Sequence, residues 1–60
     1  MFKVWTVTHP DDTSEHKNLY DAYCAMTELV EDGFEPLCRD IYNVGEPVLS
    51  YEEVTNRLHQ

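Results

Sequence analysis

A run of metal-binding residue types lies near the start of the chain, where two histidines and three carboxylates fall within eight positions. The set comprises His9, Asp11, Asp12, Glu15 and His16. Imidazole and carboxylate groups both bind divalent metals, and Asp12 and His16 would be neighbours on a helical turn. The spacing matches no established metal motif, and no HExxH pair is present. We therefore expect no metal or other cofactor, and interpret residues 9–17 as a solvated loop that leads into a helix.

Cys24 and Cys38 are the cysteines of the chain and its candidate thiol nucleophiles. A catalytic thiol needs a histidine base and a third group that orients the histidine, and no sequence signature of such a site is present. The two thiols also lack the close spacing of zinc cysteines. Gly33 and Gly45 are the only glycines, so there is no glycine-rich loop for a nucleotide phosphate. A chain of 60 residues has little room for a substrate pocket, and we expect that it is not an enzyme.

Charge is the strongest constraint on function. The chain carries 12 Asp and Glu residues against 4 Lys and Arg, for a formal net charge of -8 at pH 7. Such a field repels phosphate, which argues against direct binding to nucleic acid or to an anionic membrane. It favours a basic protein partner, and proteins that handle nucleic acid form a large class with basic grooves. The alternative is that the charge only keeps a small protein monomeric and in solution.

Compartment is indicated by the cysteine count and by the first residues. Two cysteines are too few for a disulfide-built secreted domain. The opening residues Met1–Thr6 lack the basic stretch and long apolar run of a signal peptide, and no segment has the roughly 18 apolar residues of a membrane span. We expect a cytoplasmic protein with reduced thiols.

Hydrophobic periodicity and turn residues predict a single α+β domain over residues 1–60. The expected elements are a strand at 2–8, a long helix at 18–32, a strand at 34–44, a short strand at 48–49 and a helix at 51–59. The order is β-α-β-β-α, with a sheet of two or three strands packed on one main helix plus a short C-terminal helix. If the two main strands were parallel neighbours, their connection through the long helix would be right-handed.

The ends of both helices carry recognisable signals. Asn18 can cap the long helix, and Gly33 can supply the left-handed conformation that ends it. Ser50-Tyr51-Glu52-Glu53 matches the capping box, in which the Ser50 hydroxyl and the Glu53 carboxylate each bind a free backbone N–H at the start of the helix.

The long helix has two different faces. Apolar residues form a stripe about 120° wide, and this stripe is expected to face the core. Its members are Leu19, Ala22, Tyr23, Met26, Leu29 and Val30. The opposite side carries Tyr20, Asp21, Cys24, Glu28, Glu31 and Asp32. No Lys or Arg occurs from Asn18 through Cys38, so the outer side of the helix is negative without neutralisation from within it.

This negative side is the predicted binding surface. Helix positions i and i+4 lie about 6 Å apart, similar to the spacing of phosphates along a nucleic-acid strand, so its carboxylates can occupy Arg and Lys sites that normally hold phosphate. Tyr20 can anchor such a contact, because aromatic residues are enriched at the energetic centres of interfaces. The predicted partner-binding residues are Tyr20, Asp21, Glu28, Glu31, Asp32 and Glu35.

Part of the sequence resembles a known family. The run from Phe2 through Trp5, followed by a single helix and by Gly33-Phe34-Glu35 at the start of a second strand, resembles small phage proteins that inhibit bacterial RNA polymerase. The resemblance covers about half of the chain. It implies a phage protein, acting in the host cytoplasm, whose acidic surface blocks a basic channel in a host enzyme.

Two functions from different classes follow. The first is a phage-type inhibitor or decoy that mimics nucleic acid and blocks the basic nucleic-acid-binding surface of a host or defence enzyme, such as a nuclease or polymerase. The alternative is a homodimeric structural or regulatory interaction module with no decoy role, whose apolar interface is formed by Trp5 and Val7 or by the strand that contains Tyr42. In that case the negative charge is incidental.

Overall fold

The strand expected at the start of the chain forms β1 (Phe2–Thr6), which pairs with a strand on each side. The structure is a computed structural model that describes residues 1–60. The sheet has the order β2-β1-β3-β4, and every neighbouring pair is antiparallel. The other strands are β2 (Ser14–His16), β3 (Pro36–Asp40) and β4 (Leu49–Ser50).

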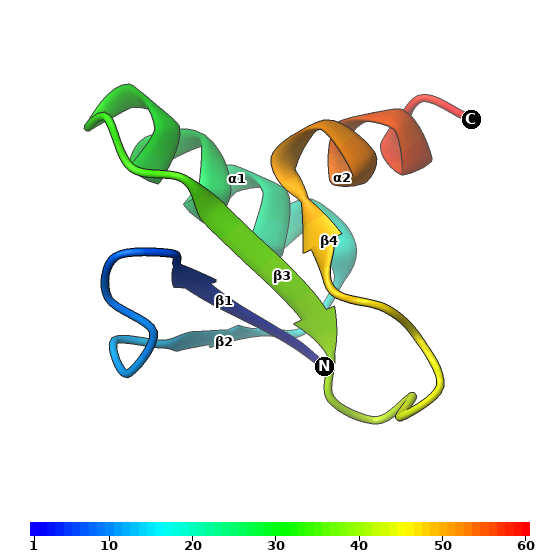
Figure 1. The fold of residues 1–60 in the computed structure, drawn as a ribbon. Helices are drawn as coiled ribbons and strands as arrows, with labels where there is room; N and C mark the ends of the chain where they lie inside the picture. Colours follow the sequence, from blue (N-terminus) through cyan, green and yellow to red (C-terminus); the bar gives the residue numbers. More distant parts are fainter.

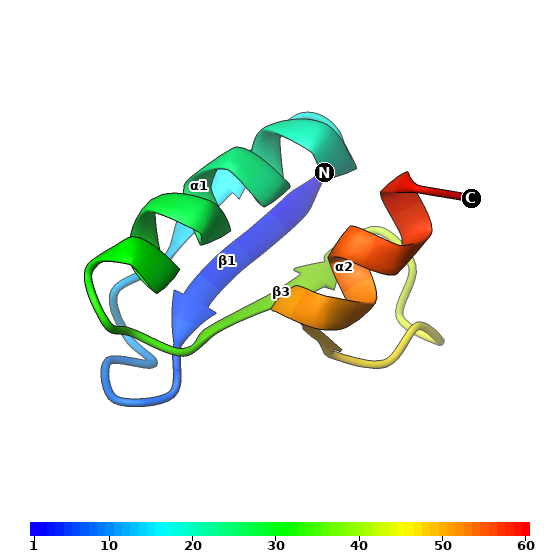
Figure 2. The ribbon, with the colours of Figure 1, turned by 90° about the horizontal axis from the view of Figure 1, so that it is seen from above.

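Both helices, α1 (Leu19–Glu31) and α2 (Tyr51–Leu58), lie on the same face of the sheet (Figures 1 and 2). The two layers make a small α+β domain with one main helix and one short C-terminal helix, which confirms the predicted fold class. Neither helix has the length and apolar character needed to cross a membrane.

The strand β2 differs from the prediction, because it lies in the segment that was expected to be a loop. Its residues pair with the first half of β1, with Phe2 opposite His16 and Lys3 opposite Glu15. An edge strand needs hydrogen bonds to one neighbour only, so it can consist of polar residues and show no apolar alternation. The sheet therefore has four strands in place of the expected two or three.

The hairpin of β1 and β2 also decides the direction of β3. The β1–β2 connection reverses the chain before α1 begins, so α1 joins β2 to β3 and returns the chain antiparallel to β1. β1 lies between β2 and β3 in the sheet. The parallel arrangement considered for the two main strands does not occur.

The second main strand is shorter than expected, because the chain turns away after β3. The Asp40 carboxylate accepts a hydrogen bond of 3.0 Å from the Tyr42 backbone N–H, and the Asn43 N–H reaches the Asp40 carbonyl at 3.3 Å. These bonds fold the residues after Asp40 into a turn of the kind that Asp side chains favour. Residues 41–48 consequently form a long connection to β4.

The predicted helix caps are confirmed. The Asn18 side chain accepts a 2.9 Å hydrogen bond from the Asp21 N–H. The Ser50 hydroxyl accepts from the Glu53 N–H, and the Glu53 carboxylate accepts from the Ser50 N–H, both at 3.2 Å. Gly33 follows α1 with φ of 88°, the left-handed conformation that glycine adopts without steric cost.

The core lies between the sheet and the helices, and it is small. Its six buried members are Val4, Ala22, Met26, Cys38, Leu49 and Val54. Leu19, Tyr23 and Leu29 pack against this cluster from α1, as the apolar stripe predicts. Val30 departs from the prediction, since it is 40% exposed in the last turn of α1, where the helix extends past the buried cluster.

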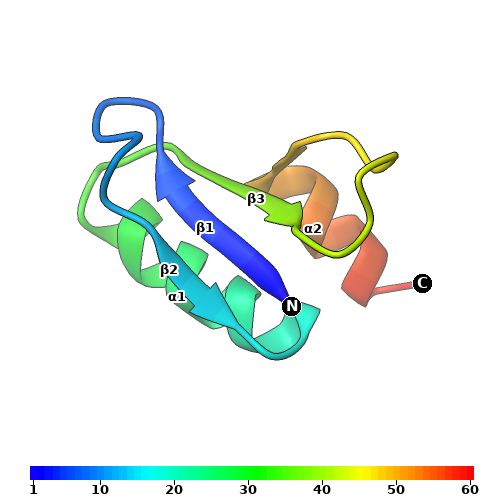
Figure 3. The ribbon, with the colours of Figure 1, turned by 90° about the horizontal axis from the view of Figure 1, so that it is seen from below.

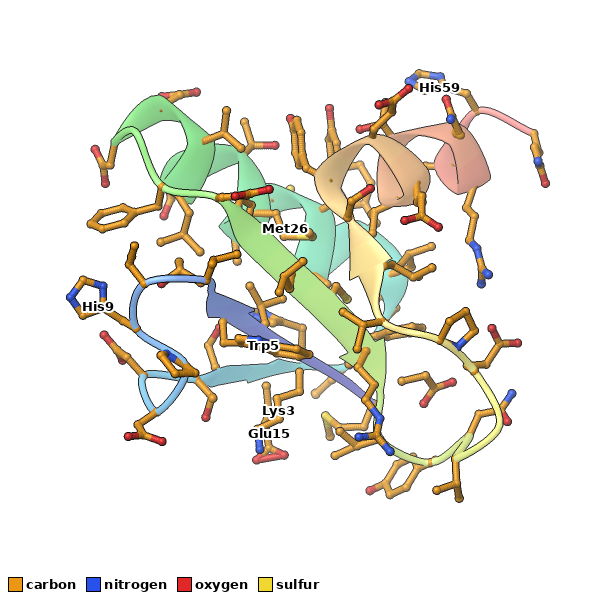
Figure 4. All side chains as sticks on the ribbon, viewed as in Figure 1. Lys3, Trp5, His9, Glu15, Met26 and His59 are labelled. Atoms are coloured by element: carbon orange, nitrogen blue, oxygen red, sulfur yellow. The ribbon has the colours of Figure 1, made fainter.

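The opposite face of the sheet has no helix over it (Figure 3). Val4 and Cys38 pair with each other on the helix side, where both are buried. Side chains alternate along a strand, so Lys3 and Trp5 project from the uncovered face. Figure 4 shows Met26 on the helix side of the sheet and the side chains of Lys3, Trp5 and Glu15 on the other.

Candidate partner-binding surface

Four carboxylates lie on the outer side of α1 and its C-cap, and all four are exposed. They are Asp21, Glu28, Glu31 and Asp32, which we call the acidic helix face. The buried Ala22 and Met26 fix the rotation of α1 against the sheet, and the acidic helix face is a consequence of that packing. The structure thus brings these four predicted residues onto one helix with their side chains in solvent.

No cation neutralises the acidic helix face. The two ion pairs of the protein join the amino terminus to Asp40 at 4.0 Å and Arg57 to Glu46 at 3.3 Å. Lys17 and Arg39, the nearest cations in sequence to α1, pair with none of its carboxylates. The four charges therefore remain available to an external partner.

Tyr20 lies beside this face on the first turn of α1 and is 63% exposed. Its ring packs against the ring of Tyr23, and the two ring centroids are 6.4 Å apart. Tyr23 in turn stacks on Tyr51 of α2, and the hydroxyls of Thr27 and Tyr51 are 2.8 Å apart. The exposed ring is thus supported by a row of side chains that joins the two helices.

The middle tyrosine of this row, Tyr23, has a raised pKa. Hydrogen bonding with the Tyr51 side chain, together with the proximity of that second phenol, raises the pKa of Tyr23 above its ordinary value. A tyrosine is neutral near pH 7 even at its ordinary pKa, so Tyr23 adds no charge to the acidic helix face.

Glu35 is separated from the other predicted partner-binding residues. It precedes β3, and its carbonyl accepts a 3.1 Å hydrogen bond from the Val7 N–H. This bond continues the β1–β3 register by one pair. Because Pro36 is buried on the helix side, Glu35 belongs by alternation to the uncovered face of the sheet.

The predicted dimer residues are also divided between two places. Trp5 and Val7 share the uncovered face of the sheet, and Val7 is 51% exposed just beyond the end of β1. Tyr42 is 76% exposed and lies in the connection after β3, outside any strand. The strand assignment of Tyr42 was therefore wrong, because the chain turns at Asp40.

The candidate metal residues do not converge. No group of three His, Cys, Asp or Glu side chains has the geometry to hold a metal ion. The His9 ring lies 3.0 Å from the Thr8 hydroxyl, and the His16 ring lies 2.8 Å from the Ser14 hydroxyl. His9 also contacts the edge of the Phe34 ring.

The two thiols lie in different environments, and neither is hydrogen bonded to a histidine. Cys24 is exposed on α1, and Cys38 is buried in the core. Burial raises the pKa of the Cys38 thiol from 9.0 to about 11, since a thiolate loses hydration in apolar surroundings. Cys38 therefore acts as a small apolar core residue near neutral pH.

A feature that sequence reasoning missed is the composition of the uncovered face. Leu37 and Arg39 lie opposite Trp5 and Lys3, so this face carries two of the four cations of the chain. The alternation of Leu37, Arg39 and Ile41 with buried Pro36 and Cys38 was a signal for it, but only the pairing with β1 shows that the residues lie together.

In comparisons with known proteins, no family model, no curated protein and no solved structure matches the chain.

Proposed function

We propose that the protein binds the basic, nucleic-acid-binding surface of another protein through its acidic helix face and so competes with nucleic acid. The observation that carries the proposal is that the four α1 carboxylates are exposed and that none is within ion-pair distance of a cation. On a protein with a net charge of -8, this surface attracts cationic partners and speeds their association.

The line of like charges along α1 supports mimicry of a nucleic-acid strand. At about 1.5 Å per residue, the stretch from Asp21 to Asp32 is about 16 Å long. The three intervals between its four carboxylates therefore average about 5.5 Å along the helix axis. A strand of DNA carries one phosphate charge per 3.4 Å or so of its axis. A row of Arg and Lys side chains arranged for phosphates would meet fewer charges on α1 than on a DNA strand of the same length, but charges of the same sign along one line.

The helix is firmly held, which favours binding without a large ordering cost. Its inner side is anchored by the fully buried Ala22 and Met26. Its flank is joined to α2 by the stacked rings of Tyr23 and Tyr51. A rigid array of charges loses less conformational entropy on binding than charges on a mobile loop.

Tyr20 supplies the apolar part of the proposed contact. Charges steer association, while affinity depends on a few well-packed anchors, among which tyrosine is common. The exposed Tyr20 ring stands next to Asp21 and is supported from behind by Tyr23. For a decoy of phage origin, the target would be a host or defence enzyme such as a nuclease or polymerase.

The test replaces the acidic helix face by amides of the same shape. The variant combines Asp21→Asn, Glu28→Gln, Glu31→Gln and Asp32→Asn. We expect it to fold as the original does, by circular dichroism, and to lose capture of nucleic-acid enzymes that the original chain retains from a bacterial lysate and that mass spectrometry identifies.

A matched variant separates the site from the net charge. Four exposed carboxylates outside α1 are replaced in the same way, through Asp11→Asn, Asp12→Asn, Glu15→Gln and Glu52→Gln. This control loses the same number of charges, and we expect it to retain capture. Equal loss of capture in both variants would mean that net charge, and not the acidic helix face, determines binding. Equal retention of capture would mean that the acidic helix face does not take part in binding.

A further inference from the structure

The uncovered face of the sheet carries several large apolar residues. Trp5 and Leu37 lie opposite each other at its centre. Val7 and Ile41 continue the β1–β3 register and extend the same face by alternation, and Val7 is exposed. An antiparallel sheet that faces water on one side normally carries polar residues there. The uncovered face instead has an apolar centre, as surfaces that bind another protein chain do.

The charges on this face differ from those of the rest of the molecule. Lys3 and Arg39 lie side by side on β1 and β3, with Glu15 beside Lys3 on β2 and Glu35 just before β3. The acidic helix face and the acidic residues of α2 lie on the other side of the sheet (Figure 2). A second copy can therefore approach this face without meeting the charges that dominate the surface.

Arg39 lacks a partner within its own chain. Its Nε atom is buried and has no hydrogen-bond acceptor, and no carboxylate pairs with its guanidinium. A buried donor without an acceptor is uncommon in folded proteins. Arg39 as a whole is only partly buried, so the other N–H donors of its guanidinium, rather than the covered Nε, are the groups that a carboxylate from outside the chain can reach.

We propose that two copies of the chain stack their uncovered sheet faces about a two-fold axis that runs across the strands at the level of Trp5 and Leu37. This operation lays β3 of one copy antiparallel over β3 of the other. Arg39 lies two residues after Leu37 and Glu35 two residues before it, so each Arg39 meets Glu35 of the second copy. Trp5 and Leu37 of both copies form the centre.

The self-complementary charges select this axis. An axis along the strands would place Lys3 against Arg39 of the second copy, because these residues are direct neighbours in the sheet, and like charges would then oppose each other. The cross-strand axis places opposite charges together twice, as a two-fold interface requires. Stacked sheets in sandwiches keep their strands within about 30° of alignment. At such an angle Arg39 of one copy still lies over Glu35 of the other, although each sheet is twisted.

The contact in such a dimer extends beyond the strands of the sheet. The backbone measures 27 × 25 × 18 Å, and these dimensions include the loops around the sheet. A standard interface covers roughly 800 Å² per partner, so the contact would involve the loops around the sheet as well as its strands. A hollow of about 340 Å³, lined by Trp5, Lys3 and Arg39 among others, gives room beside the indole for the ring of the second copy.

The chain carries its own reporter for this contact, because Trp5 is its only tryptophan. In the dimer the indole is fully buried, and on dilution it returns to the partly exposed state that it has in the single chain. We expect the fluorescence maximum to move to longer wavelength on dilution, with the same midpoint at which sedimentation equilibrium shows the mass falling from twice 7.1 kDa to 7.1 kDa. Trp5→Ser should give the monomer mass at every concentration.

Charge reversal tests the orientation. Glu35→Arg and Arg39→Glu should each raise the dimer dissociation constant about tenfold or more. An equal mixture of the two variants should restore the dimer. In the mixed dimer the unchanged Arg39 of one chain meets the unchanged Glu35 of the other, and the two introduced side chains, which are also of opposite charge, meet each other. Glu52→Arg, a reversal on the exposed side of α2, serves as the control and should leave dimerisation unchanged.

Several outcomes would overturn the inference. If the protein is a monomer at all concentrations and the Trp5 fluorescence does not change, a second copy does not cover this face. Quenching of Trp5 in a monomer by a single-stranded oligonucleotide would likewise exclude a second copy as the partner of this face. A dimer that tolerates both charge reversals, or a mixture that stays monomeric, would exclude this arrangement. The result is independent of the proposed function, because it concerns the opposite side of the molecule and is read without any partner protein.

Discussion

The rings of Tyr23 and Tyr51 stack with their centroids 5.4 Å apart and their planes 3° from parallel. Tyr23 belongs to α1 and Tyr51 begins α2, so this contact ties the short C-terminal helix to the helix that carries the acidic face. The Thr27 hydroxyl lies 2.8 Å from the Tyr51 hydroxyl and adds a hydrogen bond to the same joint. Tyr20 lies beside Tyr23 on the same helix, with ring centroids 6.4 Å apart.

The hydroxyl at this joint makes a measurable contribution to stability. Tyr51→Phe keeps the stacked rings and removes the hydrogen bond to Thr27. We expect the free energy of unfolding to fall by about 1 kcal/mol, as measured by urea denaturation. Tyr42→Phe removes a hydroxyl from a ring that is 76% exposed and should change stability by less than about 0.5 kcal/mol. Equal effects of the two substitutions would contradict the role given to the joint.

The two glycines should respond differently to alanine. Gly33 has φ of 88° with nothing within 4 Å of an added Cβ, so the cost of Gly33→Ala comes from the backbone alone and is about 1–2 kcal/mol. Gly45 has no positive φ, and an added Cβ would meet Asn43 Oδ1 at an ordinary 3.8 Å. Gly45→Ala should be neutral or stabilise by up to about 1 kcal/mol. Thermal unfolding of both variants measures the contrast, and a larger loss at Gly45 would contradict it.

The buried thiol predicts a loss of stability at alkaline pH. The folded-state pKa of Cys38 is about 11 and its ordinary value is 9.0, so the unfolded chain releases this proton first. The contribution of Cys38 to stability is complete below pH 9 and is lost as the pH rises toward about 11. Urea midpoints measured across this range should fall less steeply in Cys38→Ala than in the original chain.

The exposed thiol provides the control for this experiment. Cys24 lies in solvent on α1, and Cys24→Ala should keep the full alkaline decline. The other titratable groups are common to all three chains, so their contributions cancel in the comparison. Identical slopes for the two alanine variants would show that burial of Cys38 does not affect its ionisation.

The parts of the fold that were predictable are those with local signals. The apolar stripe of α1, the capping box of Ser50 and Glu53, and the stop at Gly33 each depend on residues close in sequence. The exposure of Asp21, Glu28, Glu31 and Asp32 followed from the same stripe, because a helix that buries one side must turn the other to solvent.

The parts that were not predictable depend on pairing between distant residues. Ser14–His16 is polar and becomes a strand only because the edge of β1 is free to bind it. The direction of β3 follows from that hairpin, and the placement of Arg39 next to Lys3 follows from the direction of β3. A sequence pattern reports which side of an element is apolar, but it does not report which element lies beside it.

Competition with nucleic acid tests the central claim most directly. A short labelled DNA duplex is bound to an enzyme that the chain captures, and displacement of the duplex is followed by fluorescence anisotropy as the chain is added. The account predicts that the original chain displaces the duplex, with an affinity that falls steeply as salt is added, and that the variant with amides at positions 21, 28, 31 and 32 is about tenfold or more weaker. An enzyme that holds the chain and the duplex together, or equal displacement by the amide variant, would contradict it.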